Sequence, residues 1–542
     1  MNYASLFLYR QAAWALGLAG GFLTGGFSAL AQNVQHLDTL HPGGMPAQPI
    51  IKSVVVTNNQ AKVTWRGFLG FDQNQNLAPF RLQGNEQLRP GQWQTLAAIY
   101  SNNATVPLAS SMTFRILGGA PEFAGAEACA QCHTNQHQNW LGTRHARALE
   151  SLNKIGKGND QSCLPCHTVG FGMPTGYTNE LVKALLGGVQ CENCHGPSAL
   201  HAANPRDFSL RPIKDLAAQV CGGCHQVSEF PTYHEWHGSR HAEVTEDMNP
   251  AGRISSCGRC HSGSSRLALM KGEDPAQTVA GDANVAITCA VCHDPHQKSH
   301  PSQLRNPVGS THDYSLATAD VFTNKYDPTI NICAQCHNHR GASWTSNTRP
   351  PHHSPQYNML IGTVGVLPSG AAPSQPAAHA LMITNQCVGC HVQMRPFNPG
   401  PPPVHGETGH SFKVENYDSC RLCHPAPELL TQAVMAGASN RVQQVKAWLD
   451  LWATTKAPAA LRTKYGARAW EFSTPGSLSN PPGVTGSGPT SAEQSQIPEN
   501  IRKARFNLYL VYYDGSFGVH NNPFNVVLLE AAENWIKIEL NQ

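Results

Sequence analysis

Cysteine and histidine recur in one fixed pattern along this chain of 542 residues. All 18 cysteines form nine C-x-x-C pairs, and a histidine follows the second cysteine of every pair. C-x-x-C-H is the attachment signature of c-type haem, because two thiols at this spacing can bond to the two vinyl groups of one porphyrin. The next residue then lies beneath the ring, where an imidazole can ligate the iron.

The pattern therefore predicts nine covalent haems, each with its own proximal histidine. The attachment pairs are Cys129/Cys132, Cys163/Cys166, Cys191/Cys194, Cys221/Cys224, Cys257/Cys260, Cys289/Cys292, Cys333/Cys336, Cys387/Cys390 and Cys420/Cys423. The proximal iron ligands are His133, His167, His195, His225, His261, His293, His337, His391 and His424.

Two other uses of paired cysteines compete with this interpretation. An exported protein can hold 18 cysteines in nine disulfides, and zinc ribbons also use C-x-x-C pairs. Neither requires histidine after each pair. Because only 27 of 542 residues are histidine, nine such coincidences have a chance on the order of 10⁻¹².

Each iron has a second face that needs a ligand. Setting aside the nine motif histidines leaves 18 of 27, enough for nine distal ligands. A distal ligand must reach the opposite face of the porphyrin, so we expect it to come from elsewhere in the chain, often from beside another haem.

Further motifs accompany the cysteine pairs. They are Trp140-x-x-Thr143-Arg144-His145-Ala146, its echo Trp236-x-x-Ser239-Arg240-His241-Ala242, the run 191–197 followed by His201, Cys292-His293-Asp294-Pro295-His296, Gly409-His410-Ser411-Phe412 and Gly518-Val519-His520-Asn521. In these motifs the chain resembles multihaem c-type cytochromes over about 127–540. That group includes tetrahaem cytochromes of ammonia oxidisers, multihaem nitrite reductases, hydroxylamine oxidoreductase and outer-surface cytochromes of metal reducers.

The resemblance implies which histidines are distal ligands. It assigns that role to His145, His201, His241, His296, His410 and His520, and with less support from the motifs to His379 and to His352 or His353, of which we select His353. The ninth distal ligand stays open among His137, His237, His300 and His312. We do not expect a ligand in His36, His41, His234, His339 or His405.

The formal charge is small before the cofactors are counted. There are 38 Lys and Arg against 35 Asp and Glu, a net +3, which argues against a nucleic-acid binder that relies on a basic surface. A ferric haem with two imidazoles and two ionised propionates contributes about −1, so nine would bring the chain to about −6. This favours redox partners with a basic surface and argues against nucleic acid as a partner.

The N-terminus has the pattern of an export signal over 1–31. Arg10 is the only charge before Asp38, an apolar glycine-rich run follows it, and Ala29-Leu30-Ala31 forms an A-x-A cleavage site. The alternative is an uncleaved membrane anchor, because the run approaches spanning length. We expect cleavage, no membrane span in the mature chain, and a location in the periplasm or at the cell surface.

The elements that must carry these ligands divide the mature chain into parts. After a leader at 32–49, short alternating runs at 50–56, 62–65, 80–83, 93–97 and 112–117 predict a small β-sandwich of the fibronectin or immunoglobulin sort over 50–120. The part at 121–425 holds nine haems, at about 33 residues each between Cys129 and His424, so we expect a mainly α and loop fold with a haem-packed core.

The part at 426–542 contains no cysteine and reads as a helical region packing on the haem domain. Val442, Val445, Leu449 and Trp452 recur at helical spacing. A Gly/Ser/Pro linker is predicted at 473–491, followed by helices from 498 to about 513 and from 522 to about 540.

Irons ligated on both faces cannot bind a substrate without losing a ligand. We therefore expect an exported nine-haem protein that transfers electrons along a chain of mostly bis-His haems, whose potentials are low because methionine ligation is what raises them. The partners are then a redox donor and acceptor, and self-association into a filament is a further possibility for the sandwich and leader.

The alternative is an oxidoreductase that acts on nitrite or hydroxylamine at one haem with an open distal face. Pentahaem nitrite reductases, which the chain resembles, carry their catalytic haem on C-x-x-C-K, whereas all nine motifs here end in histidine. Hydroxylamine oxidoreductase uses a tyrosine cross-link to haem, for which Tyr177, Tyr233, Tyr314 and Tyr357 are candidates without distinction. No catalytic residue is assigned.

Overall fold

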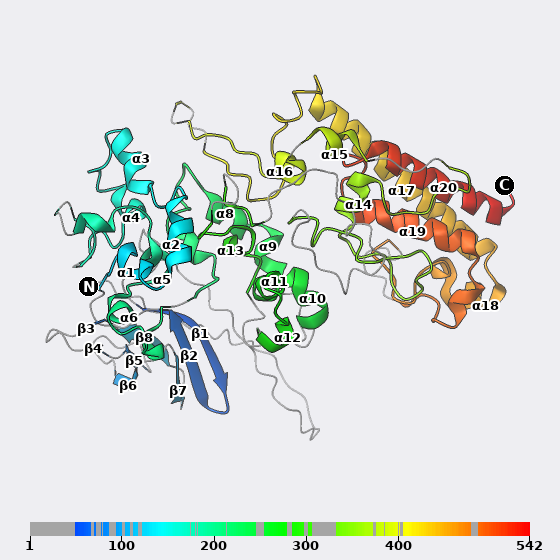
Figure 1. Ribbon diagram of the computed structural model, residues 1–542. Coiled ribbons are helices and arrows are strands. Elements are labelled where there is room, and N and C mark those ends of the chain that lie inside the picture. Colours follow the sequence, from blue (N-terminus) through cyan, green and yellow to red (C-terminus); the bar gives the residue numbers. More distant parts are fainter. Residues whose placement is uncertain are drawn as a thin grey trace. The chain divides into compact units, whose positions relative to one another are not determined.

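The structure is a computed structural model of the chain (Figure 1). It describes residues 49–542 except 67–69, 72–76, 79, 86–93, 100–102, 109–111, 118–121, 174, 179, 181–182, 213, 245–253, 279–284, 298–301, 306–331, 372–375, 384, 399, 402–404 and 479–485. The predicted signal and leader lie outside the described residues, as do His36, His41, His300, His312 and Tyr314.

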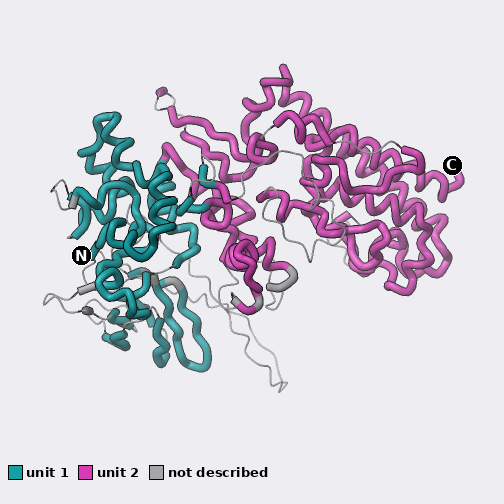
Figure 2. The backbone as a smooth tube through the Cα atoms, in the orientation of Figure 1, with its two compact units in different colours: residues 1–227, 294–303 teal, residues 228–293, 304–542 magenta. Residues whose placement is uncertain are grey.

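The chain divides into two compact units, shown in two colours in Figure 2. The first comprises residues 1–227 and 294–303, and the second comprises 228–293 and 304–542. Within the described residues, no helix is long and apolar enough to cross a membrane.

Two antiparallel three-stranded sheets form the N-terminal part of the first unit. One has the order β1-β2-β7 and the other β6-β5-β8. The strands are β1 (Ile50–Thr57), β2 (Gln60–Arg66), β5 (Phe80–Asn85), β6 (Gln94–Ile99), β7 (Asn103–Pro107) and β8 (Thr113–Leu117), with a minor pair β3 (Gly70–Phe71) and β4 (Leu77–Ala78).

Alternate residues of these strands point into one core, as the sequence pattern predicts. Trp65 packs edge-on against Phe80 at a centroid distance of 5.7 Å, and Val63 and Leu82 are fully buried. The turn between β1 and β2 places Asn58 and Asn59 at positive φ, which asparagine tolerates in tight hairpins. The sequence pattern does not predict β7, because this strand is short and ends in proline.

The segment that carries the cysteine motifs consists of short helices and loops. Between residues 122 and 425, no helix in the described part exceeds eight residues. The helices are α1 (Ala126–Ala130), α2 (Thr134–Leu141), α3 (Ala148–Lys154), α4 (Leu164–His167), α5 (Cys191–His195), α6 (Ala199–Ala203), α7 (Gln219–Gly222), α8 (Thr232–His237), α9 (Arg240–Glu243), α10 (Ile254–His261), α11 (Gly263–Met270), α12 (Pro275–Thr278), α13 (Cys289–Cys292), α14 (Gln356–Ile361), α15 (Ala378–Met382) and α16 (Gln386–His391). Many of them are the motifs themselves.

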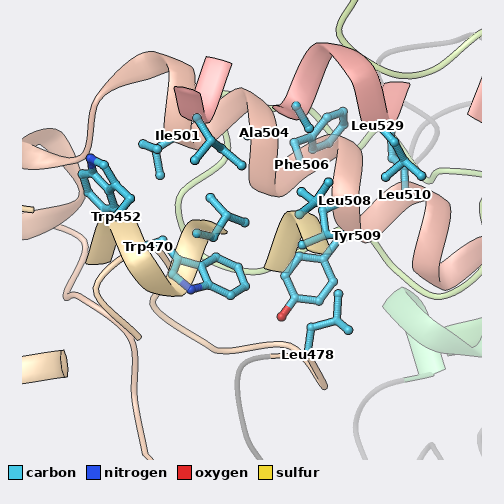
Figure 3. Packing of buried hydrophobic residues seen from close by; sticks show 14 of the residues in the cluster. Trp452, Trp470, Leu478, Ile501, Ala504, Phe506, Leu508, Tyr509, Leu510 and Leu529 are labelled. Atoms are coloured by element: carbon cyan, nitrogen blue, oxygen red, sulfur yellow. The ribbon is translucent and has the colours of Figure 1, made fainter. Parts of the chain in front are cut away.

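A helical bundle follows in the second unit, formed by α17 (Pro427–Thr455), α18 (Ala459–Tyr465), α19 (Glu499–Asp514) and α20 (Asn522–Leu540). Its core contains Trp452, Trp470, Tyr509 and Leu510, and Figure 3 shows these side chains gathered between the helices. The helices predicted at 498–513 and 522–540 match α19 and α20, whereas α17 begins well before the apolar stripe from which it was predicted.

The segment predicted as a linker at 473–491 packs against the protein where it is described. Leu478 is buried in the bundle core, and the backbone N–H groups of Ser473 and Thr474 donate to the carbonyls of Asn347 and Thr348. Its Gly, Ser and Pro content thus reflects close backbone packing as well as turns.

Candidate metal centres

The cysteine motifs share one local geometry. In most of them the histidine N–H donates to the carbonyl of the first cysteine, as in His133 to Cys129 at 2.9 Å and His337 to Cys333 at 2.8 Å. One helical turn places residues i and i+3 on the same side, so both thiols of a pair can reach one ring. All 18 cysteines are described and none is in a disulfide.

Two attachment thiols are more exposed than the rest. Cys132 and Cys423 are exposed, whereas the other cysteines, Cys224 among them, are half-buried. Each of these two thiols belongs to the second cysteine of its motif, which lies in a turn of the backbone, outside any helix.

Cys224 contacts another motif, since its hydrogen bond with Cys166 lowers the pKa of the Cys166 thiol. Haem attachment at every motif stays a prediction, because a thioether bond requires the spacing of the two thiols and not their burial.

The structure also bears on the zinc alternative. Among the described residues, no group of three or more His, Cys, Asp and Glu side chains gathers as a zinc site requires. The local geometry of the cysteine motifs fits haem attachment.

The distance between paired imidazoles is the clearest regularity of the site. Two imidazoles on opposite sides of one metal ion, with metal–nitrogen bonds of about 2.0–2.1 Å, have ring centroids about 6 Å apart. Within the described residues, seven motif histidines each face one other histidine at 6.0–6.3 Å: His225 with His145, His195 with His296, His337 with His241, His261 with His352, His293 with His410, His424 with His379, and His391 with His520.

Ring stacking does not explain this distance. The interplanar angle is 20° for His195 with His296 but 83° for His379 with His424, so the separation is constant while the orientation is not. A shared atom between the two rings accounts for both facts. The observed pairs therefore fit an iron held by two imidazoles.

An eighth motif histidine, His133, has a neighbour of the same kind. Burial lowers the pKa of His201, and the nearby charge of His133 lowers it further. His201 lies on α6, directly after the third motif, where the sequence resemblance placed a distal ligand. The two residues belong to the same compact unit.

Hydrogen bonds at Nδ1 orient several of these rings. His391 Nδ1 lies 2.9 Å from the Phe412 carbonyl, His379 Nδ1 lies 3.0 Å from the Val519 carbonyl, and His167 Nδ1 lies 2.8 Å from the Ala148 carbonyl. A carbonyl only accepts, so Nδ1 carries the proton and Nε2 keeps the lone pair that a metal needs.

Burial keeps three of the distal imidazoles neutral. Desolvation, followed by the charge of the facing motif histidine, lowers the pKa of His145 and of His241 to about 4. The pKa of His352 falls to about 3, again chiefly because of burial. A neutral imidazole is the form that binds metal, so these side chains are ready to ligate at neutral pH.

The two Trp-x-x-[Ser/Thr]-Arg-His-Ala motifs use the same scaffold twice. Trp140 Nε1 donates to the Val189 carbonyl at 2.9 Å, and Trp236 Nε1 donates to the Ile287 carbonyl at 2.8 Å. Each acceptor lies two residues before a C-x-x-C pair. The indole therefore fixes the segment that carries His145 or His241 against the start of a later motif.

The structure distinguishes histidines that the sequence left open. His352, not the selected His353, faces His261, and His353 instead stacks on His352 at 4.3 Å. The two are adjacent, so only the direction of the backbone decides between them. Among the other candidates, His137 packs beside Trp140 and His237 lies near Tyr233; neither is paired with a motif histidine.

The second motif differs from the rest. In the described part of the chain, no second imidazole ring is paired with His167, whose Nδ1 is held by the Ala148 carbonyl. His234 packs against Tyr233, and His339 lies beside Asn358. The structure thus leaves the ninth distal position without a described histidine.

Comparison with known proteins agrees with this geometry. The family model for cytochrome c554 and c-prime matches residues 128–196, which include the first three motifs. Cytochrome c-554 of Nitrosomonas europaea is 35% identical over 19% of this chain and 57% of its own length. The multiheme cytochrome MtrA of Shewanella baltica is 26% identical over 28% of this chain and 50% of its own length.

The chain thus spans only about half the length of these relatives. Among solved structures, the outer cell wall cytochrome OcwA superposes with a TM-score of 0.50 and 20% identity, covering 76% of this chain and 99% of that one. This likeness concerns the fold. From the motifs, the ring geometry and the sequence matches, we conclude that the chain is a multihaem c-type cytochrome.

Proposed function

We propose that this chain is an exported electron-transfer protein with nine c-type haems, most of them ligated by two histidines. The observation that carries the proposal is the separation of 6.0–6.3 Å that recurs in seven histidine pairs of the described structure. With both axial positions occupied, the side chains leave no room for a substrate at these irons. They can hold the cofactor and pass electrons only.

Haem iron supplies reversible one-electron chemistry when it is bound, and the protein sets its potential through ligands, burial and hydrogen bonds. Within each unit the thiols of different motifs lie at hydrogen-bond distance. Cys129 approaches Cys191 in the first unit, and Cys333 approaches Cys387 in the second. Cysteines this close anchor neighbouring porphyrins side by side, which is the spacing that a conduction path requires.

A second candidate function rests on the second motif. His167 has a fixed ring but no described imidazole across from it, so the site built on Cys163 and Cys166 is where an open distal face is expected. An open face at that haem would admit a small ligand such as nitrite or hydroxylamine. The chain would then be an oxidoreductase at one centre, supplied with electrons by the others.

Low-temperature EPR of the oxidised, cleaved protein tests both candidates, with the haem-to-protein ratio measured as pyridine haemochrome. We expect nine haems per chain, of which at least eight are low-spin. A high-spin signal worth one haem, altered by added nitrite or hydroxylamine, would support the second candidate. Several high-spin haems, or a ratio well below nine, would contradict the proposed ligand pairs.

A further inference from the structure

One ligand ring contacts a carboxylate through its Nδ1 atom. His520 Nδ1 lies 2.7 Å from Asp514 Oδ1, and the Asp514 side chain has no solvent exposure. The rings of His391, His379 and His167 instead donate to backbone carbonyls. His520 differs from these three rings, because its hydrogen-bond partner is a buried carboxylate.

The turn between α19 and α20 holds this carboxylate in place. Asp514 is the last residue of α19, and Gly515 ends the helix in the left-handed conformation with φ 72°. Ser516 Oγ donates to the other carboxylate oxygen, Oδ2, and accepts from the His520 N–H at 3.2 Å. The Asn521 side chain then caps α20 by accepting from Phe524 N–H. Both ends of the turn are thus anchored.

We propose that Asp514 is a positioning residue that lowers the reduction potential of the haem attached at Cys387 and Cys390, relative to haems whose ligands donate to neutral carbonyls. This inference rests on the proposed function, because it takes His391 and His520 as the two ligands of that haem. Their ring centroids are 6.2 Å apart.

The physical reason is the charge on the hydrogen-bond acceptor. A carboxylate draws the Nδ1 proton toward itself and makes the imidazole a stronger, more anionic ligand. The buried negative charge also favours the ferric state over the ferrous state, because the latter carries one positive charge less. Both effects act in the same direction, so this haem is reduced after its neighbours.

A matched carboxylate is found near another ligand. Asp294 Oδ1 lies 3.5 Å from His296 Nδ1, beyond hydrogen-bond distance, and both side chains are partly exposed. The same change of charge at Asp294 should therefore affect its haem much less. This makes D294N the control for D514N.

The test is spectroelectrochemical titration of the full chain as wild type, D514N and D294N. The amide that replaces Asp514 still accepts from His520, but its charge is gone. We expect one-ninth of the absorbance change to move to higher potential in D514N, with the equilibrium constant for reduction raised at least tenfold, which is about 59 mV for one electron. An unchanged curve, or an equal shift in D294N, would overturn the inference.

Two further variants separate this inference from the proposed function. H520A should convert one low-spin haem to high-spin, and if it does not, the assignment of His520 as a ligand fails. If H520A does lose one low-spin haem but the titration curve of D514N is unchanged, only the role of Asp514 is overturned. If D514N does not load haem, S516A replaces it. Removing the Ser516 hydroxyl leaves more charge on Asp514 for His520, so the same haem should move to lower potential, and an unmoved or raised potential would contradict the inference.

Discussion

Replacing His352 and His353 in turn tests the ligand geometry at one iron. The two side chains are adjacent and stacked at 4.3 Å, so each substitution removes the same group at nearly the same place. Only His352 faces a proximal histidine, with its ring 6.1 Å from that of His261. H352A should therefore remove an axial ligand, whereas H353A should remove a ring that stacks on His352 and contacts Tyr513.

The expected magnitude follows from the count of motifs. H352A leaves the haem at Cys257 and Cys260 with one imidazole, so one haem in nine, about 11% of the total, changes from low-spin to high-spin. If the site of His167 is already high-spin in the wild type, the high-spin share doubles from about one-ninth to about two-ninths. H353A should leave the share unchanged.

The assay is low-temperature EPR with double integration of the high-spin and low-spin signals, normalised to haem by pyridine haemochrome. The haem-to-protein ratio is the control for loading, because covalent attachment depends on the cysteines and not on the distal ligand. A high-spin signal in H353A and none in H352A would reverse the assignment. Low-spin spectra in both variants would refute the use of ring separation to identify ligand pairs.

Three further predictions concern stability. Burial raises the pKa of Glu471 to about 7, against about 4.3 in the unfolded chain, so the folded state binds this proton more tightly. The free energy of unfolding of the helical bundle should therefore fall by up to about 3 kcal/mol between pH 4.3 and 7. Hydrogen exchange of α19 measures this dependence on pH, and E471Q should flatten it. W140F and W236F should each lower the free energy of unfolding measured in urea by about 1 kcal/mol, because each variant loses one indole hydrogen bond. A change in only one of the two variants would contradict the equivalence of the two scaffolds. E192A should lower the melting temperature of the first unit more than W140F does, since the buried Glu192 carboxylate accepts backbone N–H groups of three residues. An unchanged melting curve would contradict its structural role.

The sequence alone indicated the cofactor chemistry, whereas the predicted division of the chain stays a prediction. Covalent haem attachment needs two thiols and an imidazole within five consecutive residues, so all of its requirements are local and can be read from the motif. The same holds for the helices α19 and α20, whose caps and apolar spacing are local, and for most strands of the N-terminal sheets. The strand β7 was not predicted, because five residues that end in proline show little alternation of apolar and polar residues.

The pairing of ligands depends on contacts between residues far apart in the chain. His145 faces His225, and His391 faces His520 across more than a hundred residues, and nothing in the local sequence states which of the remaining histidines reaches which iron. The motifs indicated several distal candidates, but not their partners. The exposure of Cys132 and Cys423 was likewise not readable from their motifs, because the same five-residue pattern occurs at half-buried and exposed places alike.

The tertiary structure alone distinguished the adjacent His352 and His353 and showed that Asp514 contacts His520. His352 and His353 are equivalent in sequence, and the direction of the backbone at that point puts one ring opposite His261 and the other on top of its neighbour. The burial of Asp514 against His520 is likewise invisible in the motif, because it depends on how α19 ends and α20 begins. Chemistry that depends on residues within one turn of the chain can be predicted from the sequence. The second ligand of each iron, and the charge of Asp514 beside His520, depend on how distant segments pack.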